Sequence, residues 1–308
     1  MAVGSRLRHV VESQQFTRSF LEDLLSRAEE IKAEPHRFSG RLNGRVMAAL
    51  FYEPSTRTRL SFEAAMLRLG GQTMGTDNAR EFSSAAKGET LEDTIRIVSG
   101  YADVIVLRHY EEGAAKRAAS VSSVPLINAG DGPGQHPTQA LLDLYTIRDE
   151  LGRIDGLNIA MVGDLANGRT VRSLAYLLSK FRQIKIWFVA PPQVAMRDDL
   201  KAHLDEHHIP WVENDDLDAV LPEVDVVYQT RIQKERFTDP AQYEALKGIY
   251  RIDDHALALM RKYAIVMHPL PRVDEIAPEV DADPRAAYFR QARNGLHIRM
   301  ALLDRLLA

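Results

Sequence analysis

The sequence predicts two α/β domains, each a mostly parallel β-sheet flanked by helices. Short runs rich in branched apolar residues alternate with stretches of helical periodicity, which is typical of parallel sheets. The alternation begins at residues 46–52 and restarts after the loop at 152–156. A chain of 308 residues with 45% hydrophobic content can bury a sizeable core, and its length favours about two domains.

The expected strands coincide with the apolar runs. They are residues 46–52, 104–107 and 124–127 in the first half, and 158–162, 184–189, 224–228 and 264–267 in the second. Residues 141–151 have a helical period and connect the halves, and residues 301–307 form another amphipathic helix. The boundary between the two domains is therefore expected near residue 150.

Composition excludes several classes of function. A net charge of -4 gives no electrostatic footprint for nucleic acid. No apolar stretch approaches 18 residues, and residues 1–6 lack the hydrophobic core of a secretion signal. The absence of cysteine excludes disulfides, thiol nucleophiles and thiolate zinc sites within the chain. We expect a cytoplasmic protein that binds neither nucleic acid nor a membrane.

Residues 52–65 combine hydroxyl and guanidinium groups at an expected strand-to-helix junction. Ser55 or Thr56 can accept hydrogen bonds from the free N–H groups of the helix that follows. The positive end of that helix favours an anion, and Arg57 or Arg59 can bind two phosphate oxygens. Because these arginines are two residues apart, we expect one at the ligand and the other in a structural contact or interface. For this run alone, a capped helix with exposed basic residues is the alternative.

Apolar residues continue at helical spacing after this turn. One line passes through Leu60 and Leu67, and another passes through Phe62 and Met66. We therefore expect a helix that is buried on more than one side and that ends before the glycines at 70 and 71.

Polar clusters follow the expected strands, where open α/β sheets usually bind ligands. The clusters are residues 83–89, 108–109 and 131–139 in the first half, and 163–170, 230–234 and 268–272 in the second. Some members also fit a structural role: His136 suits a helix cap, and Lys87 suits a solvated loop. Arg169 follows a loop that suits a nucleotide phosphate, although residues 163–168 match the dinucleotide fingerprint poorly.

The adjacent histidines His207 and His208 point apart on any regular element and make a poor metal pair. We therefore expect both at the surface.

Four motifs together give the chain a close resemblance to the aspartate/ornithine carbamoyltransferase family. The motifs are Ser55-Thr56-Arg57-Thr58-Arg59, His136-Pro137-Thr138-Gln139, Gly168-Arg169-Thr170-Val171 and His268-Pro269-Leu270-Pro271-Arg272, in family order across nearly the whole chain. The resemblance implies a carbamoyl-phosphate-binding domain at residues 1–150 and an aspartate-binding domain at 151–288. It also implies that a C-terminal helix within 289–308 returns to the first domain.

The resemblance implies that the carbamoyl phosphate site draws on both hydroxyl and cationic groups. Its residues by matching motif are Ser55, Thr56, Arg57, Thr58, Ser83, Lys87, Arg108, His136 and Gln139. The catalytic subset is Arg57, Thr58, Lys87, Arg108 and His136. The phosphate is expected against residues 55–58 and Arg108, the carbonyl oxygen near Thr58, Arg108 and His136, and the carbamoyl amide at Gln139. Ser83 and Lys87 are expected to enter from a neighbouring subunit, so that a homotrimer shares its active sites.

The aspartate site implied by the resemblance lies mainly in the second domain. Its residues are Lys87, Arg169, Arg231, Gln233, Leu270 and Pro271. Leu270 and Pro271 contribute backbone groups and are joined by a cis bond in this family, which is plausible for an X-Pro turn.

Chemistry gives these assignments a reason. The amine of aspartate attacks a carbonyl carbon, and the developing oxyanion needs fixed donors in a site that excludes water. His136 is expected to donate to that oxygen rather than act as a general base, since the departing phosphate can take the amine proton. Two domains that close over the substrates would offset much of the entropy cost of bringing them together, up to about 7–11 kcal/mol. No metal or organic cofactor is expected.

The second substrate is predicted from charge. Arg169 and Arg231 offer bidentate partners for two carboxylates, whereas a cationic ornithine side chain would need acidic or neutral acceptors. The ornithine branch carries a His-Cys-Leu-Pro motif, but this chain has proline at position 269 and no cysteine. Arg272 is expected to form an internal ion pair with Asp274 or Glu275.

We therefore expect transfer of a carbamoyl group to L-aspartate, giving N-carbamoyl-L-aspartate and phosphate for pyrimidine biosynthesis. Transfer to another amine such as ornithine is the first alternative, and a catalytically silent scaffold is the second. The sequence leaves open whether a regulatory chain or a dihydroorotase partner binds the subunit.

Overall fold

The computed structural model describes residues 7–76, 88–232 and 248–308. The chain divides into two compact units, the first comprising Met1–Leu141 with Arg293–Ala308 and the second Leu142–Ala292. One boundary falls within helix α6 (Pro137–Leu151) and the other within helix α12 (Tyr288–Leu307). Within the described ranges, no helix is both long and apolar enough to cross a membrane.

The first unit contains a four-stranded parallel sheet in its described part, with strand order β2-β1-β3-β4. Its strands are β1 (Val46–Phe51), β2 (Gln72–Thr76), β3 (Val104–His109) and β4 (Leu126–Asp131). Its helices are α1 (Arg18–Ala33), α2 (Thr56–Arg68), α4 (Leu91–Val98) and α5 (Ala114–Val121), with short 3-10 helices η1 (Ser13–Gln15) and η2 (Pro35–Phe38).

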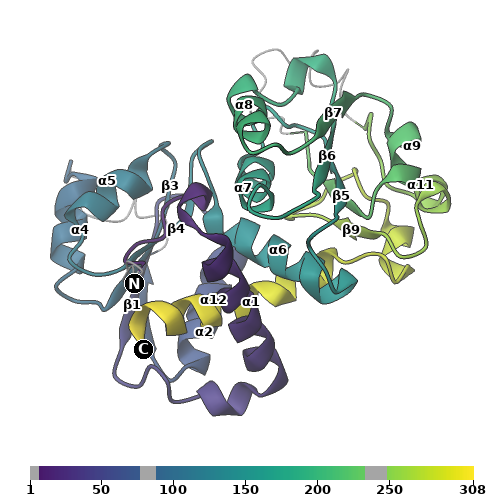
Figure 1. The fold of residues 1–308 in the computed structure, drawn as a ribbon. Coiled ribbons are helices and arrows are strands. Elements are labelled where there is room, and N and C mark those ends of the chain that lie inside the picture. Colours follow the sequence, from purple (N-terminus) through teal and green to yellow (C-terminus); the bar gives the residue numbers. More distant parts are fainter. Residues whose placement is uncertain (1–6, 77–87, 233–247) are drawn as a thin grey trace. The chain divides into compact units, whose positions relative to one another are not determined.

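Helices cover both faces of this sheet (Figure 1). One face carries α4 and α5, which pack on alternate residues of β1 such as Ala48 and Leu50. The other face carries α1, α2 and the end of α12. Asp304 of α12 accepts a hydrogen bond from Arg41 at 2.8 Å, and Arg299 lies 5.0 Å from the centre of the Phe62 ring. The C-terminal helix therefore returns to the first unit, as predicted.

The second unit has a five-stranded parallel sheet among its described residues, with order β7-β6-β5-β8-β9. Its strands are β5 (Asn158–Val162), β6 (Lys185–Val189), β7 (Trp211–Asn214), β8 (Val226–Gln229) and β9 (Ile265–Met267). Its helices include α7 (Arg169–Leu178), α8 (Asp198–Glu206), α9 (Leu217–Val220) and α11 (Asp254–Leu259), with η4 (Pro192–Val194), η5 (Leu221–Glu223) and η7 (Pro278–Ala282). Helices α7 and α8 cover one face, and α9 and α11 cover the other (Figure 1).

The two parallel α/β units confirm the predicted fold class. Every expected strand is present, but β2 and β7 were not predicted. Both are edge strands, and their residues are mostly exposed or half-buried, so neither carries an apolar run.

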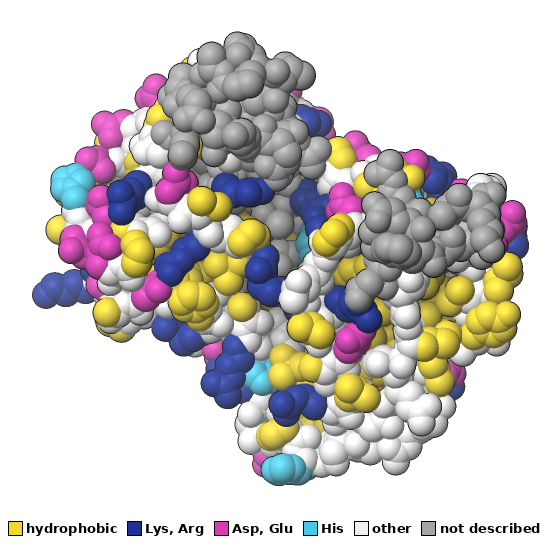
Figure 2. Space-filling model, turned by 180° about the vertical axis from the view of Figure 1, so that it is seen from behind, with side chains coloured by type: hydrophobic (Ala, Val, Ile, Leu, Met, Phe, Trp, Pro, Cys, Tyr) yellow, Lys and Arg dark blue, Asp and Glu magenta, His cyan; other side chains and the backbone are white. Residues whose placement is uncertain are grey.

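The prediction that α2 is buried on more than one side is wrong within the described chain. Phe62 and Met66 are fully buried, whereas Leu60 and Leu67 are 57% and 58% exposed. The apolar line through Leu60 and Leu67 faces away from the core of its own unit. Figure 2, which views one face of the molecule, shows hydrophobic side chains at the surface among Lys and Arg side chains.

A buried carboxyl group joins three elements of the second unit. Asp143 of α6 accepts 2.7 Å hydrogen bonds from the hydroxyl of Tyr228 in β8 and from Nε2 of Gln291 in α12. All three side chains are almost completely buried. Burial, followed by the nearby Asp143, raises the pKa of Tyr228 well above its usual value, so the hydroxyl remains a donor.

Replacing Asp143 by alanine should destabilise the second unit by about 2–5 kcal/mol, because two buried donors lose their acceptor. Urea unfolding of the full chain at neutral pH measures the loss. The matched control is Asp149→Ala, at an exposed position of the same helix, which should change stability by less than about 0.5 kcal/mol. Equal effects of the two substitutions would contradict the role given to Asp143.

Candidate active site

Parallel strand pairing collects the predicted residues of the first unit at one edge of its sheet. Phe51 at the end of β1 pairs in register with Arg108, and the Tyr52 N–H donates to the Arg108 carbonyl at 2.9 Å. His109 at the end of β3 pairs with Asp131 at the end of β4. The loop before α2, the end of β3 and the loop before α6 therefore leave neighbouring strands at their carboxyl ends.

The N-terminus of α2 is not capped by the side chain that was expected to cap it. Ser55 is the N-cap residue, but with φ -159° and ψ 84° its side chain makes no capping hydrogen bond. The first backbone bond of the helix runs from the Arg59 N–H to the Ser55 carbonyl at 3.1 Å. Ser55, Thr56 and Thr58 are thus the N-cap and first-turn residues of a helix end that favours an anion.

The two arginines of this helix have different surroundings, as their spacing predicted. Arg59 pairs with Glu63 one turn later at 2.7 Å. Arg57 is exposed and has no ion pair or side-chain hydrogen bond with any described residue. Partial desolvation lowers the pKa of Arg57 below its usual value, yet an arginine remains charged at neutral pH. Arg57 is thus the cation at this helix end that a phosphate can engage.

Contacts with Ala129 and Glu53 help to hold Arg108 in place. Its Nη1 donates to the Ala129 carbonyl of β4 at 3.2 Å, and its Nη2 lies 3.3 Å from a carboxylate oxygen of Glu53. Glu53 was not singled out in the sequence, although it lies two residues before Ser55. Because Glu53 orients the guanidinium, an anion that binds Arg108 does so beside this carboxylate.

His136 has the helix-capping role that the sequence allowed, and it has this role through its backbone. Its carbonyl accepts hydrogen bonds from the N–H groups of Gln139 and Ala140 at 3.0 and 3.2 Å, so its backbone begins helix α6. Its imidazole is buried, with Nδ1 3.4 Å from Oγ1 of Thr138. Gln139 is 9% exposed in the first turn of the same helix. A capping backbone therefore leaves the side chain able to act on a ligand.

The second unit has an open pocket at the carboxyl ends of β5 and β8. Its described lining is Gly163, Gln229, Thr230, Arg231, Ile232, Gly248, Tyr250, Asp274 and Glu275. Gly163 has φ +113°, and a side chain there would lie 2.4 Å from the Thr230 carbonyl. Only glycine permits this close approach of the two strand ends.

Two of the predicted arginines follow these adjacent strands. Val162 of β5 pairs in register with Gln229 of β8, so the loops that leave the two strands start side by side. Arg169 is the first residue of α7, after the loop that follows β5, and Arg231 lines the pocket after β8. Both are half-buried.

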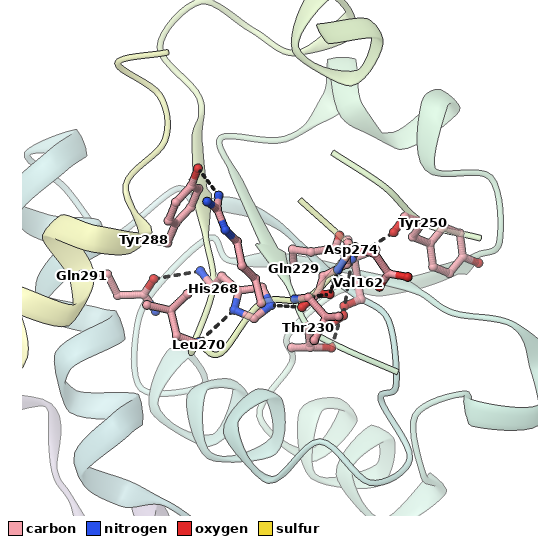
Figure 3. A network of polar contacts seen from close by, with 12 residues as sticks. Val162, Gln229, Thr230, Tyr250, His268, Leu270, Asp274, Tyr288 and Gln291 are labelled. Carbon is pink, nitrogen blue, oxygen red and sulfur yellow. Dashed lines mark hydrogen bonds and ion pairs between the residues drawn. The ribbon is translucent and has the colours of Figure 1, made fainter. Parts of the chain in front are cut away.

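The loop that follows β9 is fixed by a chain of hydrogen bonds (Figure 3). The side chain of Gln291 accepts from the His268 N–H at 2.8 Å, and His268 Nδ1 accepts from the Leu270 N–H at 2.8 Å. Leu270 has φ +54° and is joined to Pro271 by a cis bond, as expected from the resemblance. The backbone at Leu270 and Pro271 is thus held by buried side chains.

Glu275 completes this network, and the sequence analysis did not predict its role. Because His268 Nδ1 is an acceptor, the ring proton is on Nε2, which donates to Glu275 at 2.8 Å. The other oxygen of Glu275 accepts from the N–H groups of Val273 and Asp274 at 3.0 and 3.1 Å. Burial alone would raise the pKa of Glu275, but the hydrogen bonds from His268 and the backbone outweigh it and lower the pKa.

The expected ion pair of Arg272 with Asp274 or Glu275 is wrong. Arg272 pairs instead with Asp281, and its Nη1 donates to the Tyr288 hydroxyl at 3.0 Å. Glu275 is occupied by His268, which removes it as a partner. Asp274 is exposed and lines the pocket.

Three predicted site residues, Ser83, Lys87 and Gln233, lie outside the described residues.

Replacing Glu275 by glutamine should destabilise the protein by about 1–3 kcal/mol at neutral pH, because an amide donor then faces a donor. Because the pKa of Glu275 is lowered in the folded state, its ionised carboxylate stabilises the fold, and this stabilisation is fully present above the unfolded pKa of about 4.3. That contribution is lost as the pH falls through the lowered folded value. Urea unfolding at pH 7 and at pH 3.5 measures the free energy of unfolding of wild type and variant. The difference between the two proteins should be smaller at pH 3.5 than at pH 7.

Asp274→Asn is the matched control for this experiment, since the neighbouring carboxylate is exposed. It should leave stability within about 0.5 kcal/mol at pH 7. If Glu275→Gln and wild type had the same free energy of unfolding at pH 7, or if their difference grew in acid, the role given to Glu275 in the network would be contradicted.

Comparison with known proteins matches both units to one family. Residues 8–149 match the family model described as Aspartate/ornithine carbamoyltransferase, carbamoyl-P binding domain, and residues 155–306 match the Asp/Orn binding domain of that family. A rice (Oryza sativa subsp. japonica) protein titled aspartate carbamoyltransferase, chloroplastic, is 60% identical, covering 100% of this chain and 87% of the relative.

Solved structures of aspartate transcarbamoylase from Trypanosoma cruzi have the same fold. One, in complex with N-(phosphonacetyl)-L-aspartic acid, is 44% identical with a TM-score of 0.92, covering 98% of this chain and 96% of that one. Another, in complex with carbamoyl phosphate and aspartate, is 43% identical with a TM-score of 0.92, covering 98% and 97%. The chain therefore belongs to the aspartate/ornithine carbamoyltransferase family, in its aspartate carbamoyltransferase branch.

Proposed function

We propose that the chain catalyses transfer of the carbamoyl group of carbamoyl phosphate to the amine of L-aspartate. The products are N-carbamoyl-L-aspartate, a precursor in pyrimidine biosynthesis, and phosphate. The observation that carries the assignment is the helix end at Ser55–Thr58, whose N-cap and first turn carry hydroxyls and the charged Arg57 and so suit an anion. A solved structure of the Trypanosoma cruzi relative holds the same two substrates, carbamoyl phosphate and aspartate.

In this proposal the first unit binds carbamoyl phosphate. The phosphate lies against residues 55–58 and Arg108, where one exposed and one oriented guanidinium can form charge-assisted hydrogen bonds. Thr58, Arg108 and His136 donate to the carbonyl oxygen as negative charge develops there. Gln139 binds the carbamoyl amide.

The second unit binds aspartate. Arg169 and Arg231 pair with its carboxylates, and the backbone at Leu270–Pro271 provides fixed polar groups on the loop held by His268. Attack by the amine forms the C–N bond, the C–O bond to phosphate breaks, and the departing phosphate takes the amine proton. The proposed roles of Ser83, Lys87 and Gln233 complete the set of site residues. Residues 1–150 with 289–308, and 151–288, are the proposed substrate domains.

Substrate choice is tested by supplying carbamoyl phosphate with either L-aspartate or L-ornithine. Phosphate release and carbamoylated product are then measured together. We expect turnover with aspartate, because the arginines attract its carboxylates. Asp274, an exposed carboxylate in the pocket lining, would attract a cationic substrate, which is why ornithine is included. Turnover with ornithine alone would overturn the substrate assignment, and no turnover with any amine would favour a silent scaffold.

Arg57→Ala should weaken carbamoyl phosphate binding at least about tenfold, since a charged hydrogen bond contributes about 1.5–3 kcal/mol. Isothermal titration with carbamoyl phosphate measures this loss. The control is Arg59→Ala, which removes the arginine two residues away that pairs with Glu63. Unchanged affinity in Arg57→Ala, or an equal loss in both variants, would count against the phosphate site.

We also propose a homotrimer in which neighbouring subunits share active sites. Leu60 and Leu67 support an interface, since they form an exposed apolar line on α2. The edge strand β2, with exposed Met74, lies in the same unit. A regulatory chain or a dihydroorotase is the further partner to test, by solution mass with and without each candidate.

Shared active sites predict recovery of activity in mixed oligomers. Chains carrying Lys87→Ala and chains carrying His136→Ala should each be nearly inactive alone. Mixing them under conditions that exchange subunits should restore part of the activity, because some sites then receive both intact residues. A mixture no more active than its components, after subunit exchange is shown by mass, would contradict sharing.

We propose a cytoplasmic location for the protein. The rice relative is titled chloroplastic, so location differs among family members if this proposal holds. Fractionation of source cells and immunodetection of the chain test it.

A further inference from the structure

Three side chains able to bind a metal lie together at the C-terminal end of α8, and none belongs to the candidate active site. One ligand atom from each of His203, Glu206 and His207 lies within 4.8 Å of the others. Their spacing of three and four residues places them on one face of the helix. The adjacent pair His207 and His208 was expected to make a poor metal site, and the partner one turn earlier, His203, was not predicted.

The surroundings of His203 determine which of its ring nitrogens is free. Oγ of Ser179 donates to the Tyr176 carbonyl at 2.9 Å, and it lies 3.1 Å from Nε2 of His203. Because the hydroxyl has a single proton, the His203 ring must donate from Nε2 to Ser179. The lone pair of neutral His203 is therefore on Nδ1. The Tyr176 ring packs edge-on against the His203 ring, with the ring centres 4.7 Å apart, and so restrains the imidazole.

His207 is oriented in a complementary way. Its Nδ1 lies 2.9 Å from the His203 carbonyl, which can only accept, so Nδ1 carries the proton. This leaves the lone pair on Nε2. In both histidines one ring nitrogen is thus engaged by a protein group, which is the arrangement that fixes metal-binding histidines in known sites.

The electrostatics of the helix end favour a cation. The C-terminal end of α8 carries the negative end of the helix dipole, and Glu206 adds a carboxylate. Burial, together with His207 and Lys180, lowers the pKa of His203 against the opposing effect of Glu206. Lys180 is the nearby charge that opposes a cation.

We propose that His203, Glu206 and His207 form a binding site for a divalent transition-metal ion of the Zn²⁺ type. His203 contributes Nδ1, His207 contributes Nε2 and Glu206 contributes a carboxylate oxygen. Two imidazoles and one carboxylate suit Zn²⁺, Co²⁺ or Ni²⁺, whereas Mg²⁺ and Ca²⁺ prefer ligands that are all oxygen. The chain has no cysteine, so no thiolate competes for the ion.

Titration of Zn²⁺ into the full chain tests the proposal, in a buffer that does not chelate metal at pH 7.5. We expect one high-affinity equivalent per chain, and a loss of affinity of at least about tenfold in His207→Asn and in Glu206→Gln. Cobalt gives a second readout, because ligation by these residues produces a visible absorption band that the variants lose.

The matched control is His208→Asn, since His208 is the exposed neighbour with φ +55°, a conformation that asparagine tolerates. It should bind Zn²⁺ as tightly as the wild type does. Circular dichroism and carbamoyl transfer, measured without added metal, should be unchanged in all three variants. Wild-type affinity in His207→Asn, or an equal loss in His208→Asn, would overturn the site.

Discussion

The candidate active site has two half-sites: the candidate carbamoyl phosphate site of the first unit and the candidate aspartate site of the second. Both depend on the parallel pairing of the strands in their own sheet. In a parallel sheet every strand ends at the same edge, so loops that are distant in sequence emerge side by side. In the first unit, Phe51 at the end of β1 pairs in register with Arg108 of β3. In the second unit, Val162 at the end of β5 pairs in register with Gln229 of β8. The ends of these strands are fixed by backbone hydrogen bonds and close packing, which gives the polar side chains a rigid base.

The arginines in and beside the candidate site differ in the groups that they contact. Arg59 is neutralised within its own helix, whereas Arg57 has no described carboxylate partner. Arg108 is oriented by Glu53 and a carbonyl. In the second unit, buried carboxyl groups serve positioning: Asp143 holds Gln291, and Glu275 holds His268. Positive charge thus remains available to anionic substrates, while most buried negative charge has fixed donors.

Much of the fold could be predicted from sequence, because central parallel strands are apolar runs. Most of the candidate site residues fall on the loops that follow these strands, which is why the sequence pointed to them. The strands β2 and β7 could not, since an edge strand needs no apolar run. Periodicity placed Leu60 on an apolar line but could not say whether its own unit covers it. The residues that pair with Arg272 and Glu275 are set by the path of the proline-containing loop at 268–275. That path cannot be inferred from which residues are neighbours in sequence. The spacing of His203 and His207 was visible, and a search at four-residue intervals would have found it.

The central claim is that the two half-sites serve one reaction. Its most direct test is titration with N-(phosphonacetyl)-L-aspartate, which carries a phosphonate and an aspartate in one molecule. We expect tight binding to the wild type, with large losses of affinity from both Arg57→Ala and Arg169→Ala and none from Arg59→Ala. Binding that survives either of the first two substitutions unchanged would contradict it.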